Sequence, residues 1–96
     1  MNRLLFLDSI SGIKYPEMLV QFFDQFIALK HIIEDNGKIT VEAQDNESII
    51  FVATFSDSSV RDYALSNTIP TIVIYGRPIT VQTDIVSDTQ LRFILH

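Results

Sequence analysis

Two short apolar runs, each followed by a helix-like segment, constrain this fold more than any other feature of the sequence. The first run spans residues 4–10 and the second residues 49–55, and each has the length and composition of a buried strand. After the first run, apolar side chains at residues 19, 22, 23, 26 and 27 follow the spacing of one helix face. After the second, Ser56-Asp57-Ser58 is typical of a helix N-cap. The pattern predicts two strand–helix units whose strands lie side by side in one sheet.

The end of the first helix has two interpretations. In one, helical spacing continues through residue 33 and residues 38–44 form the second strand. In the other, the helix ends near residues 25–27 and residues 29–34 form that strand. Asn36-Gly37 is then a tight hairpin turn, and residues 38–44 are an additional strand or an ordered loop.

The second half of the chain is rich in predicted strands. A helix to about residue 66 precedes strands at residues 71–75 and 78–82, with a turn at Gly76. Ser87 is a potential cap for residues 88–95, which form either a third helix, the preferred interpretation, or a last strand. The order β-α-β-β-α-β predicts an α+β, ferredoxin-like sandwich, with a four-stranded antiparallel sheet and both helices on one face.

Composition limits the class of protein. The chain has 96 residues, 47% of them hydrophobic, no cysteine and a formal net charge of −5. These values predict a single intracellular domain, nuclear or cytoplasmic, without disulfides. No apolar stretch has the length of a membrane span, and the acidic charge disfavours nonspecific nucleic-acid binding. His31 and His96 are the chain's only imidazoles, so we expect no metal site, and we expect no cofactor.

Several motifs resemble the RNA recognition motif family over residues 3–84. Leu5-Phe6-Leu7-Asp8-Ser9-Ile10 resembles the family's first-strand motif, and Phe23-Asp24-Gln25-Phe26 resembles the end of its first helix. Gly76-Arg77-Pro78-Ile79-Thr80-Val81 is similar to the opening of its fourth strand. The resemblance implies an RNA-recognition domain over residues 1–86, a C-terminal appendix over residues 87–96 packing on or beside the sheet, and single-stranded RNA binding in RNA metabolism, such as mRNA processing.

The third strand departs from the family motif. Ser48 occupies the position of a basic residue, while Ile50 and Val52 replace two outward aromatic rings. Phe51, Ala53 and Phe55 then point into the core. Because bases bind such a sheet by stacking on rings, RNA binding would be weak or atypical, with Phe6 as the main ring. The implied nucleic-acid contacts are Phe6, Asp8, Lys38, Ile50, Val52, Arg77, Thr80 and Gln82.

The same aliphatic face supports a second hypothesis. Leu4, Phe6, Ile50 and Val52 would form an apolar patch that binds a protein partner or a second copy of the chain. A small enzyme is a third and weaker possibility, because no set of side chains has the spacing of a catalytic site. We therefore expect a non-enzymatic binding module.

Overall fold

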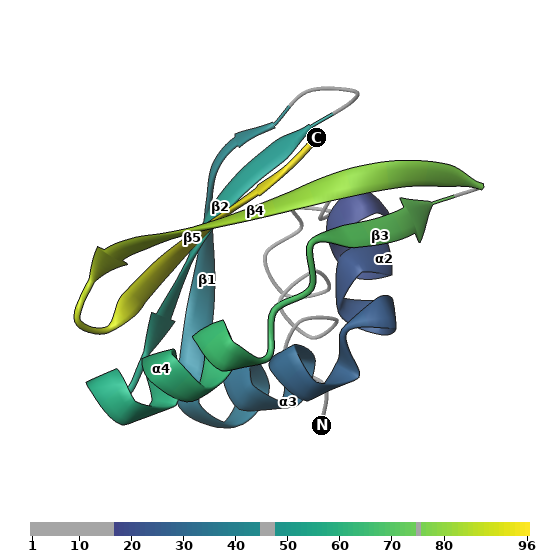
Figure 1. The fold of residues 1–96 in the computed structure, drawn as a ribbon. Helices are drawn as coiled ribbons and strands as arrows, with labels where there is room; N and C mark the ends of the chain where they lie inside the picture. The colour runs from purple at the N-terminus through teal and green to yellow at the C-terminus, as the bar shows by residue number, and fades with distance from the viewer. Residues whose placement is uncertain (1–16, 45–47, 75) are drawn as a thin grey trace, which may run out of the picture.

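The computed structural model describes residues 17–44, 48–74 and 76–96. The elements, labelled as in Figure 1, are helices α2 (Glu17–Gln25), α3 (Ile27–Asn36) and α4 (Ser58–Ser66), and strands β1 (Gly37–Gln44), β2 (Ile49–Phe55), β3 (Thr71–Ile74), β4 (Arg77–Ser87) and β5 (Gln90–Leu95). Leu4, Phe6 and Asp8 lie outside the described residues, so the predicted first strand stays a prediction.

The described strands form one five-stranded sheet in the order β1-β2-β5-β4-β3, and every neighbouring pair is antiparallel. The α+β class is confirmed, but the sheet differs from the expected four-stranded one. Along its length β2 pairs with β1 on one side and β5 on the other. Strands β1 and β5 therefore occupy both positions beside β2.

The C-terminal segment is the largest correction. Residues 90–95 form the middle strand of the described sheet, so the alternative of a last strand is correct and the preferred helix is wrong. Ser87 ends β4 instead of capping a helix, and a short turn leads into β5. Strand β4 is also longer than predicted, because it continues to residue 87 beside β5. Arg61 of α4 donates a hydrogen bond from Nη1 to the Ser87 carbonyl oxygen at 2.8 Å, which ties the helix to this hairpin.

The long-helix interpretation of the N-terminal half is correct, with a break. Helices α2 and α3 are separated by Phe26, whose φ of −124° and ψ of 63° are not helical. The alternative strand at residues 29–34 and the Asn36-Gly37 hairpin turn were wrong, since α3 runs to Asn36 and β1 begins at Gly37. A Cβ at Gly37 would lie 2.8 Å from the Thr54 carbonyl oxygen. Glycine therefore lets the chain pass directly from helix to strand against β2.

Two predicted local signals are confirmed. Asp57 caps α4, because its Oδ1 accepts a hydrogen bond of 2.9 Å from the Val60 amide. The Ser59 hydroxyl, first, and that amide, second, hold the pKa of Asp57 below its ordinary value. Gly76 has a φ of 77° between β3 and β4, a left-handed conformation that glycine adopts without strain.

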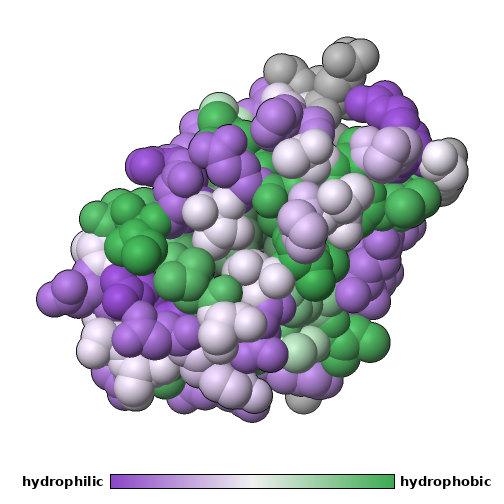
Figure 2. Space-filling model, viewed as in Figure 1, coloured by the Kyte–Doolittle hydropathy of each residue, from purple (hydrophilic) through white to green (hydrophobic). Residues whose placement is uncertain are grey.

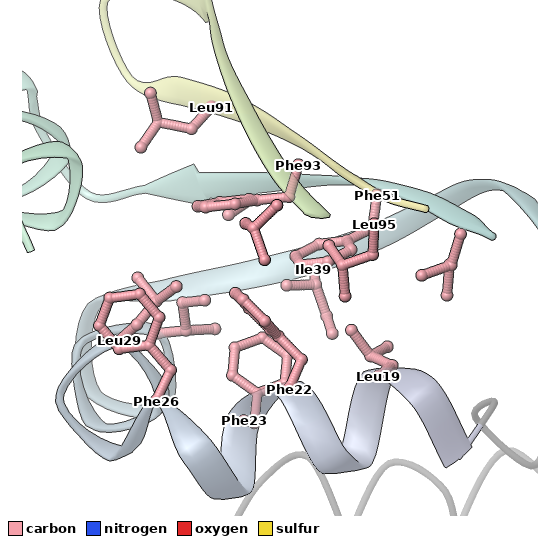
Figure 3. Packing of buried hydrophobic residues seen from close by; sticks show 14 of the residues in the cluster. Leu19, Phe22, Phe23, Phe26, Leu29, Ile39, Phe51, Leu91, Phe93 and Leu95 are labelled. Atoms are coloured by element: carbon pink, nitrogen blue, oxygen red, sulfur yellow. The ribbon is translucent and has the colours of Figure 1, made fainter. Parts of the chain in front are cut away.

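The core lies between the sheet and the helices, which are together on one side of the twisted strands (Figure 1). In Figure 3, Leu19, Phe22 and Phe23 of α2 point from the helix towards Phe51 and Phe93. The Phe51 and Phe93 rings stack with centroids 5.1 Å apart, and Phe22 lies within 5.9 Å of both. The predicted inward set of β2, namely Phe51, Ala53 and Phe55, is buried as expected.

Candidate interaction surface

The side of the sheet away from the helices carries most of the predicted contact residues that the structure describes. Strand residues that alternate with the buried ones form this surface, which we call the outer face. Its members are Lys38, Thr40, Ala43, Ile50, Val52, Thr54, Thr80, Gln82, Asp84, Gln90, Arg92 and Ile94, together with Glu42 at the irregularity of β1.

Strand register arranges the outer face in rows. One row crosses the sheet as Ala43, Ile50, Ile94 and Gln82. The next row is Thr40, Val52, Arg92 and Asp84. A third row begins with Lys38, Thr54 and Gln90. The register therefore brings Lys38, Ile50, Val52 and Gln82, four of the predicted contact residues, to one surface.

The two other predicted contact residues on β4, Thr80 and Arg77, lie on opposite sides of the sheet. Thr80 is on the outer face, and its backbone exchanges hydrogen bonds of 2.9 and 3.0 Å with His96. Arg77 pairs with Ile74 at the hairpin end, and the alternation along β4 assigns it to the side of the buried Ile79. Arg77 is thus not part of the same surface as Lys38.

Val52 is not the open apolar residue that the sequence suggested, since it is only 8% exposed. Arg92 Nε on β5 donates a hydrogen bond of 2.7 Å to Glu42 Oε1 on β1, and Nη2 lies 3.4 Å from Oε2. Strand β2 lies between those two strands, so this ion pair crosses over it. Val52 is directly opposite Arg92, and the pair therefore covers its side chain.

Charges on the outer face cancel. Its cations are Lys38 and Arg92, and its anions are Glu42 and Asp84. The Arg92 hydrogen bond, followed by the Arg92 charge, holds the pKa of Glu42 below its ordinary value. The Glu42 hydrogen bond and charge raise the pKa of Arg92, and the Asp84 charge adds to this effect. The surface is thus neutral, although the chain carries a net charge of −5.

Polar side chains of this face also bond to one another. Gln90 Nε2 donates a hydrogen bond of 3.1 Å to Thr54 Oγ1, across β5 and β2. Gln82 Nε2 donates a hydrogen bond of 3.1 Å to Asp84 Oδ2. The side-chain amides of Gln90 and Gln82 are therefore engaged within the face and are less available to a hydrogen-bonding ligand. Ile50 and Ile94, which are opposite each other and half-buried, remain the apolar part of the surface.

The two edges of the described sheet differ. On β3, the Gln25 side chain takes the place of a further strand: its Nε2 donates to the Val73 carbonyl oxygen, and its Oε1 accepts a 3.0 Å bond from the Val73 amide. On β1, the described residues provide a strand partner on one side only. The exposed residues along this strand include Lys38, Thr40 and Glu42.

Sequence reasoning missed Glu42, Asp84, Arg92 and Gln25. The signal for Arg92 was present, because Leu91, Phe93 and Leu95 alternate with polar or half-buried neighbours in the period of a strand. That alternation identifies β5 and assigns Arg92 to its outward side. Gln25 carries no such local signal, since its partner Val73 lies 48 residues away in the chain.

The exposed hydrophobic side chains are dispersed. Figure 2 shows that hydrophilic residues divide them into separate groups on the side that it presents. Among the described residues the large exposed ones are Ile27, Tyr63, Val73, Ile85 and Val86. Val73 alternates with the buried Ile72 and so lies on the outer side of the edge strand β3, whereas the other four lie outside the rows of the outer face.

The described ranges contain no cluster of three or more acidic, histidine or cysteine side chains that could bind a metal ion. They also contain no helix long and apolar enough to span a bilayer. A scan against protein-family models and searches of curated proteins and solved structures found no match to this chain.

Proposed function

We propose that this chain is a non-enzymatic interaction module that associates with a second copy of itself through the exposed side of its sheet. The observation that supports this proposal is the charge balance of the outer face. The positive charges of Lys38 and Arg92 cancel the negative charges of Glu42 and Asp84, although the whole chain has a net charge of −5. Two acidic molecules repel each other over most of their surfaces. The neutral side of the sheet is where a second copy approaches with least repulsion.

The symmetry of a pair of identical chains adds to this argument. A two-fold interface uses the same patch on both copies, so a patch with both signs of charge can pair with itself. Among the described residues β1 has a strand partner on one side only, and its other side offers backbone donors and acceptors in addition.

Single-stranded RNA is the other partner that the sequence suggests, and the outer face supports it less. RNA needs cations for its phosphates and rings for its bases. Glu42 already engages Arg92, and the described positions of this face carry no aromatic side chain. Lys38 remains as a cation without an ion pair among the described residues.

Sedimentation equilibrium of the full chain, from micromolar to millimolar concentration, tests the proposal. We expect a reversible monomer–dimer equilibrium, with backbone amide shifts on dilution that concentrate on the exposed side of the sheet. A parallel titration with a uridine oligonucleotide should leave the spectra unchanged. A monomer at all concentrations would exclude self-association, and shifts of Lys38, Ile50 and Gln82 with RNA alone would favour the RNA hypothesis instead.

A further inference from the structure

The edge of the sheet at β1 is built differently from the edge at β3. An edge strand presents unpaired N–H and C=O groups that form a template for another strand. Gln25 occupies this template on β3 by pairing with both backbone groups of Val73. On β1, eight residues long, no strand or side chain of the described ranges fills the corresponding positions.

We propose that β1 pairs antiparallel with β1 of a second copy, with the two-fold axis at Thr40. This rests on the proposed self-association and places it at the β1 edge of the outer face, so that the two outer faces adjoin side by side and do not cover each other. In an antiparallel pair of identical strands, the numbers of any two opposite residues add up to the same value. With the two-fold axis at Thr40, this residue lies opposite Thr40 of the second copy. Lys38 then lies opposite the partner's Glu42. Because of the symmetry this pairing of opposite charges occurs twice.

Charge selects this register over its neighbours. A shift of two residues in one direction brings Lys38 opposite the partner's Thr40, and a shift in the other brings it opposite the partner's Gln44. Neither alternative pairs Lys38 with an anion. On the inner side, the proposed register places Ile39, which is buried, opposite the partner's Val41, which is half-buried. Both faces of the pair are then matched, polar with polar and apolar with apolar.

Local geometry limits the length of the pair. The register of β1 against β2 shifts between Val41 and Ala43, so the regular part of the strand ends near Glu42. The Glu42 carboxylate keeps its bond to Arg92, and its side chain is 40% exposed. A carboxylate accepts several hydrogen bonds, so Lys38 of the partner can approach without displacing Arg92.

The hydrogen bonds between the Gln25 side chain and Val73 on β3 determine what kind of assembly results. A sheet with two open edges can extend into a fibre, whereas one open edge used symmetrically gives a closed dimer. Gln25 closes the second edge. In the dimer, the outer faces of both copies lie on the same side of one continuous sheet.

A single introduced cysteine tests the register, because the chain has no cysteine of its own. Opposed residues in an antiparallel pair have Cα atoms about 4.5–5.5 Å apart, within the range of a disulfide. Thr40→Cys should therefore oxidise to a covalent dimer. Lys38→Cys, exposed on the same strand, is the matched control: its two copies would be about 14 Å apart, too far for a bond.

The charge pairing is tested separately with Lys38→Glu, which places two anions opposite each other twice. We expect the dimer dissociation constant to rise about tenfold or more. Arg77→Glu is the control, because it makes the same change in net charge on an exposed residue away from β1. Its dissociation constant should rise clearly less.

The outcomes separate the two proposals. A wild-type chain that stays monomeric overturns both. A wild-type dimer in which Thr40→Cys and Lys38→Cys cross-link equally, or in which neither does, overturns the β1 register and leaves self-association standing. Equal weakening by Lys38→Glu and Arg77→Glu also overturns the register, since only net charge then matters.

Discussion

The Arg92 guanidinium lies over the outer face with Glu42 on one side and Asp84 opposite on the neighbouring strand. Its hydrogen bond holds the pKa of Glu42 below the ordinary value. Arg92→Gln should therefore raise the Glu42 pKa back towards that value. An NMR pH titration of the Glu42 side-chain carboxyl measures the change. An unaltered Glu42 pKa in this variant would show that the ion pair does not form in solution.

Asp84→Asn is the matched control for that titration. Asp84 acts on Arg92 through charge alone, so the variant should leave the Glu42 pKa almost unchanged. The sign for stability follows from the lowered pKa. The contribution of Glu42 is fully present above its ordinary pKa and is lost as pH falls through the lowered folded-state pKa. Arg92→Gln should remove this acid-dependent loss.

Residue-scale features were predictable where they depend on neighbours in the chain. Alternation along β2 correctly assigned Phe51, Ala53 and Phe55 to the core. The burial of Val52 was not predictable in the same way. It depends on Arg92 and Glu42, which lie 50 residues apart in the chain and meet only because their strands flank β2.

At the scale of elements, the junction of α3 and β1 depends on Gly37. A Cβ there would lie 2.8 Å from the Thr54 carbonyl oxygen and 3.3 Å from a Phe55 ring carbon. Because the first contact is with backbone, the added atom cannot be relieved by a side-chain rotation. Gly37→Ala should lower the free energy of unfolding by about 1–3 kcal/mol, measured by urea denaturation.

Ala43→Ser, on an exposed position of the same strand, controls for substitution in β1 as such and should change stability by less than about 0.5 kcal/mol. A Gly37→Ala chain as stable as the wild type would mean that the junction is looser than its contacts indicate.

The elements that sequence reasoning predicted well have strong local signals. Asp57 marks the start of α4, and Gly76 marks the turn between β3 and β4. Asn36-Gly37 misled in one interpretation because the same dipeptide suits a hairpin turn and a helix end. Ser87 misled because a serine before a polar turn resembles a helix cap, while the alternation in β5 was the better signal.

Strand order belongs to the whole molecule, and it was the least predictable feature. Strand β2 is followed in the chain by α4, β3 and β4, yet its second neighbour is β5 at the C-terminal end. No local pattern encodes that pairing. It is favoured by the packed interior, where Phe51 of β2 and Phe93 of β5 stack and α2 covers both.

Phe22 connects the helical layer to this pair of strands. Its ring centroid lies 5.8 Å from that of Phe51 and 5.9 Å from that of Phe93, and its side chain is 0% exposed. Phe22→Ala should cost about 3–5 kcal/mol, because it removes a ring from a closed core and leaves a cavity. That is a large part of the roughly 5–15 kcal/mol typical of a domain. Urea denaturation followed by circular dichroism measures it.

The matched control is Ile27→Ala, on the neighbouring helix at a side chain that is 57% exposed, which should change stability by less than about 0.5 kcal/mol. If Phe22→Ala were no more costly than Ile27→Ala, α2 would not be packed on β2 and β5. If Phe22→Ala lowers the stability as much as expected, amide hydrogen exchange in β5 should accelerate together with that in β2. The two strands would then unfold as one unit, because the same ring stabilises both.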